Sequence, residues 1–338
     1  MPTNRHFIYL TLIATVLAFF VIVLGAYVRL SHAGLGCPDW PGCYGRMVMP
    51  LDEEVSVALK HDFKERPVEH GKAWKEMIHR YAAGTLGLVI LMLLVLAWKG
   101  RNTSGQSVKL PVILVLLVIF QALLGMWTVT LLLKPVIVMG HLIGGMTLLS
   151  LLFWMLLRSA DINQTRVNGQ EKIIPWAIAA ITMVAIQIVL GGWTSANYAA
   201  LVCPDFPTCQ GKWWPQMDFL EGFVLWRGLG IDYEGGVLGG EARAAIHMSH
   251  RLGALLTLVI VGAVVIKTVL TGNTAIRAIG AVIGIVLLLQ ITLGITNIIK
   301  VIPISVAVAH NGMAAVLLLC LITLLNFITG RKRDGNVF

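Results

Sequence analysis

The sequence predicts an all-α membrane protein with eight transmembrane helices, built as two tandem four-helix bundles related by internal duplication. Three observations lead to this prediction: a very apolar composition, eight long hydrophobic runs, and a cysteine motif that recurs together with histidines at a nearly constant spacing. Of the 338 residues, 57% are hydrophobic and only 13% are charged. A soluble domain carries about 25% charged residues, so the composition excludes an ordinary soluble protein.

The eight runs are each long enough to cross about 30 Å of hydrocarbon. They lie at residues 7–30, 76–98, 110–133, 136–157, 173–194, 244–267, 276–299 and 304–329. The first run is too long for the core of a signal peptide and lacks a small-residue cleavage site, so we expect it to be retained. No Arg- and Ser-rich transit segment is seen, which favours a bacterial protein.

The charge distribution predicts the orientation in the membrane. An even number of spans places both termini on one side, and the segments on that side account for the whole formal net charge of +9. The only basic residues in the short loops on the other side are Lys134 and Lys300. The positive-inside rule therefore predicts cytoplasmic termini and a multi-pass protein of the bacterial inner membrane. The basic balance reflects topology and does not indicate nucleic-acid binding.

A short cysteine motif follows the first run and recurs much later. "CPDWPGC" joins Cys37 to Cys43, and "CPDFPTC" joins Cys203 to Cys209. With cytoplasmic termini both loops face the periplasm, where disulfides persist, so we expect a local disulfide in each. Cys320 lies inside the last span, where it is interpreted as a small apolar packing residue.

Other elements repeat with the cysteine loops, which predicts two units at residues 1–160 and 161–338. In each unit a long loop, at about 31–75 and 195–243, joins the first two spans. "QALLG" at Gln121–Gly125 matches "QITLG" at Gln290–Gly294. The matched residues are Cys37 and Cys203 at a spacing of 166, His79 and His250 at 171, and His141 and His310 at 169.

Five of the nine histidines lie near the periplasmic ends of predicted spans, three to seven residues into the helices. They are His79, His141, His247, His250 and His310. A histidine at membrane depth indicates function by default. The other four lie in termini or loops, where a solvated surface position is the ordinary interpretation: His6, His32, His61 and His70.

Each unit thus brings two histidines to similar depth on two helices. Facing imidazoles on bundle helices suit axial ligation of a haem iron, whereas zinc or copper usually brings carboxylate, cysteine or further histidine ligands. Arg80 and Arg251 directly follow one histidine of each pair. They could extend to the membrane interface or pair with haem propionates, and the sequence leaves both roles open.

The two units differ three residues before the first histidine of each pair. Glu76 stands there in the first unit and His247 in the second. Since residues i and i+3 share a helix face, we expect Glu76 to point toward the same site as His79. This difference favours one catalytic site and one electron-transfer site, with a plain salt bridge to Arg80 or Lys72 as the alternative.

The chain resembles haem A synthase, the membrane enzyme that oxidises haem O on the route to cytochrome oxidase. The resemblance rests on the eight spans in two halves, "EMIHR" at the second span, the paired cysteines, and histidines at the matching helices. It implies that His250 and His310 ligate a haem b cofactor and that His79 and His141 receive haem O. It also implies that Glu76 is the essential acid in converting the C8 methyl to a formyl through an alcohol.

The same resemblance implies partners: haem O as substrate, haem O synthase as its donor, an electron acceptor that the sequence does not identify, and the lipid bilayer. It leaves the oligomeric state open, a homo-oligomer included. Two other functions stay as alternatives, a di-haem b-type electron carrier and a haem transporter or chaperone. A carrier needs haem sites at both depths, and a transporter usually has a longer tryptophan-rich signature. A disulfide-generating quinone oxidoreductase would leave the membrane histidines unexplained.

Overall fold

The computed structural model describes residues 5–48, 69–102, 107–160 and 170–329. Within these ranges the chain is helical without a strand, and eight of its helices are long and apolar enough to cross a membrane. The predicted all-α membrane fold is therefore confirmed. The long helices are α1 (Arg5–Leu30), α3 (His70–Gly100), α4 (Lys109–Thr130), α5 (Pro135–Ser159), α6 (Ile174–Ala196), α8 (Gly240–Val269), α9 (Thr274–Ile299) and α10 (Ile304–Ile328).

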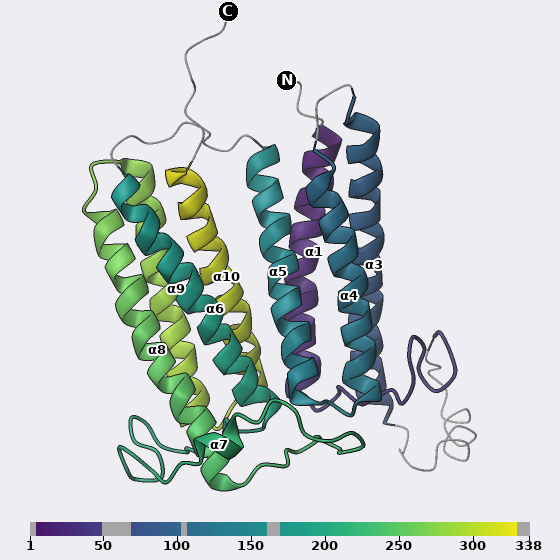
Figure 1. Cartoon of the computed structure of the whole chain (residues 1–338), viewed down its shortest axis with the longest axis vertical. Coiled ribbons are helices and arrows are strands. Elements are labelled where there is room, and N and C mark those ends of the chain that lie inside the picture. Colours follow the sequence, from purple (N-terminus) through teal and green to yellow (C-terminus); the bar gives the residue numbers. More distant parts are fainter. Residues whose placement is uncertain (1–4, 49–68, 103–106, 161–169, 330–338) are drawn as a thin grey trace, which may run out of the picture.

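The eight helices form two groups of four that stand side by side (Figure 1). One group contains α1, α3, α4 and α5, and the other contains α6, α8, α9 and α10. α1 begins and α10 ends at the same end of the bundle, whereas both cysteine loops lie at the opposite end, called the loop end below. The short helix α7 (Phe219–Gly222) also lies at the loop end.

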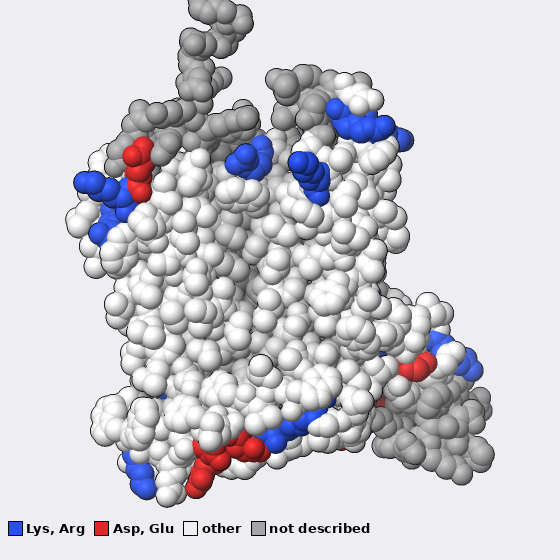
Figure 2. Space-filling model, viewed as in Figure 1, with Lys and Arg blue, Asp and Glu red and all other residues white. Residues whose placement is uncertain are grey.

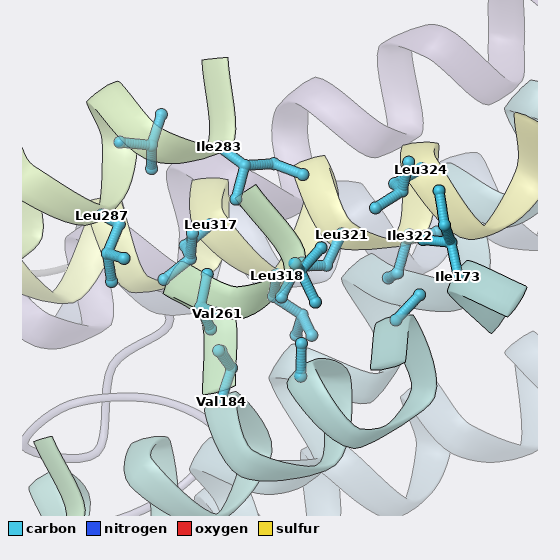
Figure 3. Close-up of a cluster of buried hydrophobic side chains, with 14 of the residues drawn as sticks. Ile173, Val184, Val261, Ile283, Leu287, Leu317, Leu318, Leu321, Ile322 and Leu324 are labelled. Atoms are coloured by element: carbon cyan, nitrogen blue, oxygen red, sulfur yellow. The ribbon is translucent and has the colours of Figure 1, made fainter. Parts of the chain in front are cut away.

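Aliphatic side chains fill the centre of each group. In the second group a buried cluster joins α6, α8, α9 and α10 and includes Val184, Val261, Ile283 and Leu321 (Figure 3). A second cluster, which includes Ile90 and Leu149, fills the first group. Since lipid tails are as apolar as these side chains, close packing rather than the hydrophobic effect holds such helices together.

On the face seen in Figure 2, charged side chains lie at the two ends of the bundle. Figure 2 shows a broad uncharged band between two charged ends on the face in view. Lys99, Arg158 and Lys267 occupy the last turns of α3, α5 and α8, at the end away from the cysteine loops. This arrangement is what a bilayer requires, because a charged side chain at the hydrocarbon centre costs several kcal/mol.

The two groups meet through α1 and α5 on one side and α6 and α10 on the other. At the loop end Arg29 of α1 donates hydrogen bonds to the Tyr198 hydroxyl and the Ser195 carbonyl, each at 2.7 Å. The His32 ring stacks on the same Tyr198 ring with their centres 5.8 Å apart. His32 thus lies at the junction between the groups, and its side chain is exposed there, as expected for a loop residue.

The second long loop also crosses onto the first group. The Lys134 side chain is 2% exposed, and its ammonium donates to the carbonyls of Arg227 and Gly228. The same ammonium lies 3.4 Å from the centre of the Trp226 ring. Tyr233 completes the contact by donating its backbone N–H to the Leu132 carbonyl at 3.1 Å. The loop of one half therefore covers part of the loop end of the other.

Two helices begin earlier than their hydrophobic runs predict. α3 begins at His70 rather than 76, and α8 begins at Gly240 rather than 244. Hydropathy marks only the apolar part of a helix, and the first turns of α3 ("HGKAWKE") and α8 ("GEARAAI") are too polar to count. His79 and His250 therefore lie deeper within their helices than expected. His70 opens α3, while His61 lies outside the described residues.

Candidate functional site

Each cysteine loop is closed by a disulfide and packs on the first turns of a long helix. Cys37 is bonded to Cys43 and Cys203 to Cys209, as predicted. All four cysteines are buried, the first pair against Ala73 and Met77 of α3 and the second against Met248 of α8. A side chain at Gly36 would come within 2.6 Å of the Lys72 backbone, so this glycine allows the loop to approach α3 closely.

The two loops also share their internal hydrogen bonds. Asp39 accepts the backbone N–H groups of Tyr44 and Gly45, at 2.6 and 2.8 Å. Asp205 accepts those of Gln210 and Gly211, at 2.6 and 3.0 Å, and also the Thr208 hydroxyl. Both loops contain a cis peptide bond before the second proline. In each loop the second cysteine also forms an isolated antiparallel β-bridge with the residue three positions later. The repeated sequence thus folds into a repeated local structure.

Arg80 and Arg251 hold these loops onto the helices. Arg80 donates to the carbonyls of Asp39, at 2.9 Å, Pro41 and Gly42. Arg251 donates to the carbonyls of Thr208 at 2.7 Å and Asp205 at 2.8 Å, and also to those of Cys203 and Pro207. The described structure therefore gives both arginines a loop-anchoring role that the sequence did not suggest. Their contact with haem propionates stays a prediction.

Glu76 is buried, with 5% of its surface exposed, and both of its carboxylate oxygens have partners. Oε1 accepts a hydrogen bond from Arg80, and Oε2 accepts the backbone N–H of Cys37 at 2.9 Å. The salt bridge considered as an alternative is therefore present. The carboxylate faces the disulfide loop and connects it to α3, which places the acid directly at the loop end of the first group.

His247 stands at the matching place in the second group and has a different chemistry. Its Nδ1 lies 3.0 Å from the Ala199 carbonyl oxygen, to which it can donate, and the residue is 4% exposed. Both Glu76 and His247 therefore tie the loop region to the helix below it. Only the first group does so with an acid that is paired to the loop-anchoring arginine.

His79 and His141 come together from α3 and α5. Their ring centres lie 6.4 Å apart, with the ring planes at 76°. Metal–imidazole bonds are about 2 Å long, so a single metal ion fits between rings at this separation. The structure thus brings His79 and His141 together. That His250 of α8 and His310 of α10 face one another in the second group stays a prediction.

A glycine of a neighbouring helix lies directly behind each of these four imidazoles. An added Cβ at Gly25 would lie 3.0 Å from His79, and one at Gly191 would lie 3.0 Å from His250. The corresponding distances are 3.5 Å for Gly125 with His141 and 3.1 Å for Gly294 with His310. Contacts of 3.0 to 3.1 Å are tighter than most real Cβ contacts, so a side chain at three of these glycines would push the adjacent imidazole from its observed position.

Glutamines of α6 and α9 contact the second histidine pair. The Gln187 amide nitrogen lies 3.0 Å from Nδ1 of His250 and donates to the His250 carbonyl at 3.0 Å. Nδ1 of His310 lies 3.1 Å from the Gln290 carbonyl oxygen. A ring that donates Nδ1–H to a carbonyl keeps Nε2 free as a metal ligand.

These residues fit a haem better than a protein-only metal site. All four rings are partly buried and keep accessible surface. Within the described ranges, no group of three or more His, Cys, Asp or Glu side chains is placed to hold a metal ion. A haem needs only two protein ligands because the macrocycle supplies the others. Buried amide atoms without partners in the described chain lie beside the histidines: Gln121 Nε2, Gln187 Oε1 and Gln290 Oε1.

Sequence reasoning missed the glycines and Gln187, although a signal for them exists. "IVLG" occurs at Ile22–Gly25 and again at Ile188–Gly191, at the same spacing of 166 as the cysteine loops. Gly125 and Gly294 end the repeated "QALLG" and "QITLG". A repeat identifies such positions, but only the structure shows that each glycine faces a histidine.

The fold and the site define a class: a polytopic helical membrane protein with two histidine pairs beneath two disulfide-closed loops. The chain belongs to the COX15-CtaA family, described as cytochrome oxidase assembly protein, whose model matches residues 8–322. It is 43% identical over 320 residues to a protein of Shewanella oneidensis named Heme A synthase, covering 94% of each chain. A Heme A synthase of Caulobacter vibrioides is 26% identical, covering 90% of this chain and 91% of the relative.

Proposed function

We propose that this protein is a haem A synthase of the bacterial inner membrane. The observation that carries the proposal is the pairing of His79 with His141 beneath a loop that a buried acid, Glu76, anchors. At the matching position of the second half, three residues before His250, stands His247 instead of an acid. The family membership and the names of the relatives support the same function.

The proposal assigns different tasks to the two halves. Residues 1–160 receive haem O, the substrate, between His79 and His141. Residues 161–338 hold a resident haem b between His250 and His310. The matching loops, arginines and glycine–histidine contacts support an origin of the halves by duplication. After duplication, one copy would have kept cofactor binding while the other acquired the reaction.

The proposed reaction oxidises the C8 methyl of haem O to a hydroxymethyl and then to a formyl group. Each oxidation releases two electrons and two protons, and water supplies the oxygen atom in the first. Bound haem b would supply reversible one-electron chemistry, and an acceptor would receive the electrons released. His79 and His141 hold the substrate's iron and so fix the position of its ring edge. Glu76 lies on the helix that carries His79, where it can take up the protons released at the oxidised carbon, as a positioned carboxylate does in general base catalysis.

Arg80 supports this role by holding the Glu76 carboxylate in place. It donates to Glu76 and to three carbonyls of the first loop, so the acid, the loop and α3 form one hydrogen-bonded unit. A carboxylate at this depth is costly without a cation beside it. The Arg80 guanidinium beside the carboxyl group offsets part of that cost.

The proposed orientation places both termini in the cytoplasm and both cysteine loops in the periplasm. The basic last turns of α3, α5 and α8 support this orientation through the positive-inside rule. The substrate would then enter near the periplasmic side, delivered by a haem O synthase in the same membrane.

The direct test is to co-express the protein with a haem O synthase, purify it and separate the extracted haems by chromatography. We expect haem A and its hydroxymethyl precursor together with haem B. Haem B alone, at two equivalents per chain, would contradict the proposal and indicate a di-haem electron carrier.

A further inference from the structure

The two histidine pairs differ in the polar support of the ring that lies on the second helix of each half. In the second half, Gln187 of α6 reaches His250 of α8 and makes two contacts, to ring Nδ1 and to the backbone carbonyl, each at 3.0 Å. In the first half, the His79 ring contacts His141 and Gly25, and no hydrogen bond to it occurs within the described residues.

The Gln187 side chain fits because α8 leaves room for it. An added Cβ at Gly253 would lie 2.3 Å from Gln187 Oε1 and 2.8 Å from a Leu190 methyl. Any side chain at position 253 would therefore displace the amide from the place where it meets His250. Gly253 lies one helical turn after His250, so the Gln187 amide packs against the glycine and the histidine together.

The matching positions of the first half carry neither feature. The spacing of 166 that relates "IVLG" in α1 and α6 places Val21 opposite Gln187. The spacing of 171 that relates His79 to His250 places Ala82 opposite Gly253. At these matched positions, the amide and the space that it needs are present together in the second half and absent together from the first, where a different glutamine, Gln121, packs against Gly144 after His141.

Resting on the proposed function, we propose that Gln187, seated against Gly253, is the positioning residue that makes the His250–His310 site the permanent haem site. The amide holds the Nδ1 edge of the His250 ring and so fixes the orientation of this imidazole. His79, which lacks this support, can release its haem, as a site for a substrate and its product must.

The physical basis is the hydrogen bond to the outer nitrogen of a metal-binding imidazole. Such a bond fixes ring orientation and tunes the ligand's basicity, and its loss typically costs about 10- to 100-fold in metal affinity. An amide suits either protonation state because it carries both a donor and an acceptor. Valine offers neither, so the first half keeps the ligand but loses the restraint.

The test uses the full-length protein purified from membranes, with haem loss measured by transfer to excess apomyoglobin. Gln187→Val removes the amide, whereas Gly253→Ala keeps the amide but fills the space that it occupies. We expect each variant to lower the affinity of the second site by about 10- to 100-fold. Val21→Ala, at the matching position of the first half, is the control and should leave haem b binding unchanged.

Two further readouts separate positioning from a general loss of folding. The reduction potential of the low-spin haem should shift in Gln187→Val, because the bond acts on the ligand's basicity. In a His250→Ala background, the double change Val21→Gln with Ala82→Gly should slow haem loss from the first site, and a gain of binding cannot come from misfolding.

Unchanged haem affinity and potential in Gln187→Val would overturn the inference. So would a Gly253→Ala variant that loses haem when Gln187→Val does not. Failure of the proposed function has a different signature, which is haem B alone, at two equivalents per chain, in the wild-type protein co-expressed with a haem O synthase. The two failures are therefore distinguishable in one set of preparations.

Discussion

The two disulfide loops are built alike, but the helices below them differ at the positions that face the loop and the histidines. Each loop has an aspartate that accepts backbone N–H groups, a cis-proline turn and an arginine that donates to its carbonyls. Below them stand Glu76 in one half and His247 in the other. The shared parts therefore build a scaffold, and the unshared parts are where the two halves can differ in chemistry.

The largest difference should appear when these two residues are removed. Glu76→Ala should lower haem A formation by about 10²- to 10⁴-fold, the usual contribution of a positioned acid or base, while haem b stays bound. His247→Ala should change conversion far less, because His247 contacts a loop carbonyl and carries no carboxylate. The measurement is the ratio of haem A to haem O extracted from cells that make haem O.

Glu76→Gln sharpens this result because the glutamine can still accept the Cys37 N–H. If this variant forms haem A at the normal rate, anchoring of the loop is the whole function of Glu76, and the proton-transfer role is wrong.

Removing Arg80 should lower the stability of the protein more than removing Arg251. Arg80→Ala leaves the buried Glu76 carboxylate without its cation, and breaking a buried pair in this way costs about 3–5 kcal/mol. Within the described residues Arg251 donates hydrogen bonds to carbonyls and forms no salt bridge, so Arg251→Ala should cost less, about 1–3 kcal/mol. Chemical unfolding in detergent micelles measures both. Equal losses for the two variants would show that the Glu76–Arg80 pair adds nothing to stability.

The glycines behind the histidines allow a graded test within one molecule. Gly25→Ala and Gly191→Ala place a methyl 3.0 Å from an imidazole, whereas Gly125→Ala places it at an ordinary 3.5 Å. Overpacking typically costs about 1–3 kcal/mol, so the first two variants should displace His79 and His250 and the third should be tolerated. Haem content and the low-spin absorption bands report the displacement. Loss of haem in Gly125→Ala alone would contradict this account.

The smallest effect concerns the second loop and depends on pH. The Thr208 hydroxyl, together with the backbone N–H groups of Gly211 and Gln210, holds the pKa of Asp205 below its ordinary value. A carboxylate with a lowered pKa stabilises the loop above its unfolded pKa of about 4, and this contribution disappears as the pH falls through the folded value.

Protection of the Cys203–Cys209 disulfide from a phosphine reductant should therefore persist in mild acid and fail only below about pH 4. Asp205→Ala should expose the disulfide at all pH values. If reduction of the wild-type loop accelerates already near neutral pH, Asp205 does not control the order of the loop.

Sequence reasoning predicted the parts of the molecule that repeat or that a bilayer imposes. The eight spans follow from hydropathy, and the disulfides follow from two closely spaced cysteine pairs. The pairing of His79 with His141 follows from their matched depth on two helices of one bundle. These features depend on local composition or on the spacing of repeated residues, and the sequence shows both directly.

Contacts between distant segments could not be predicted in this way. Arg80 donates to backbone carbonyls near residue 40. Every residue has such a carbonyl, so the sequence does not show which of them accepts the hydrogen bond. The position of Gln187 beside His250 depends on the space at Gly253, which exists only when α6 and α8 are packed. The contact of Lys134 with Arg227 and Gly228 depends on the path of a long loop across the junction.

The division of labour between the halves is the central claim, and the haem content of single-half variants tests it most directly. His250→Ala and His310→Ala are compared with His79→Ala and His141→Ala, each purified after co-expression with a haem O synthase. We predict that the first two variants lose haem B, while the last two keep haem B with its low-spin spectrum and contain no haem A. Retention of haem B by His250→Ala and His310→Ala, with its loss from the other two, would show that the resident haem lies in the first half and would contradict the account.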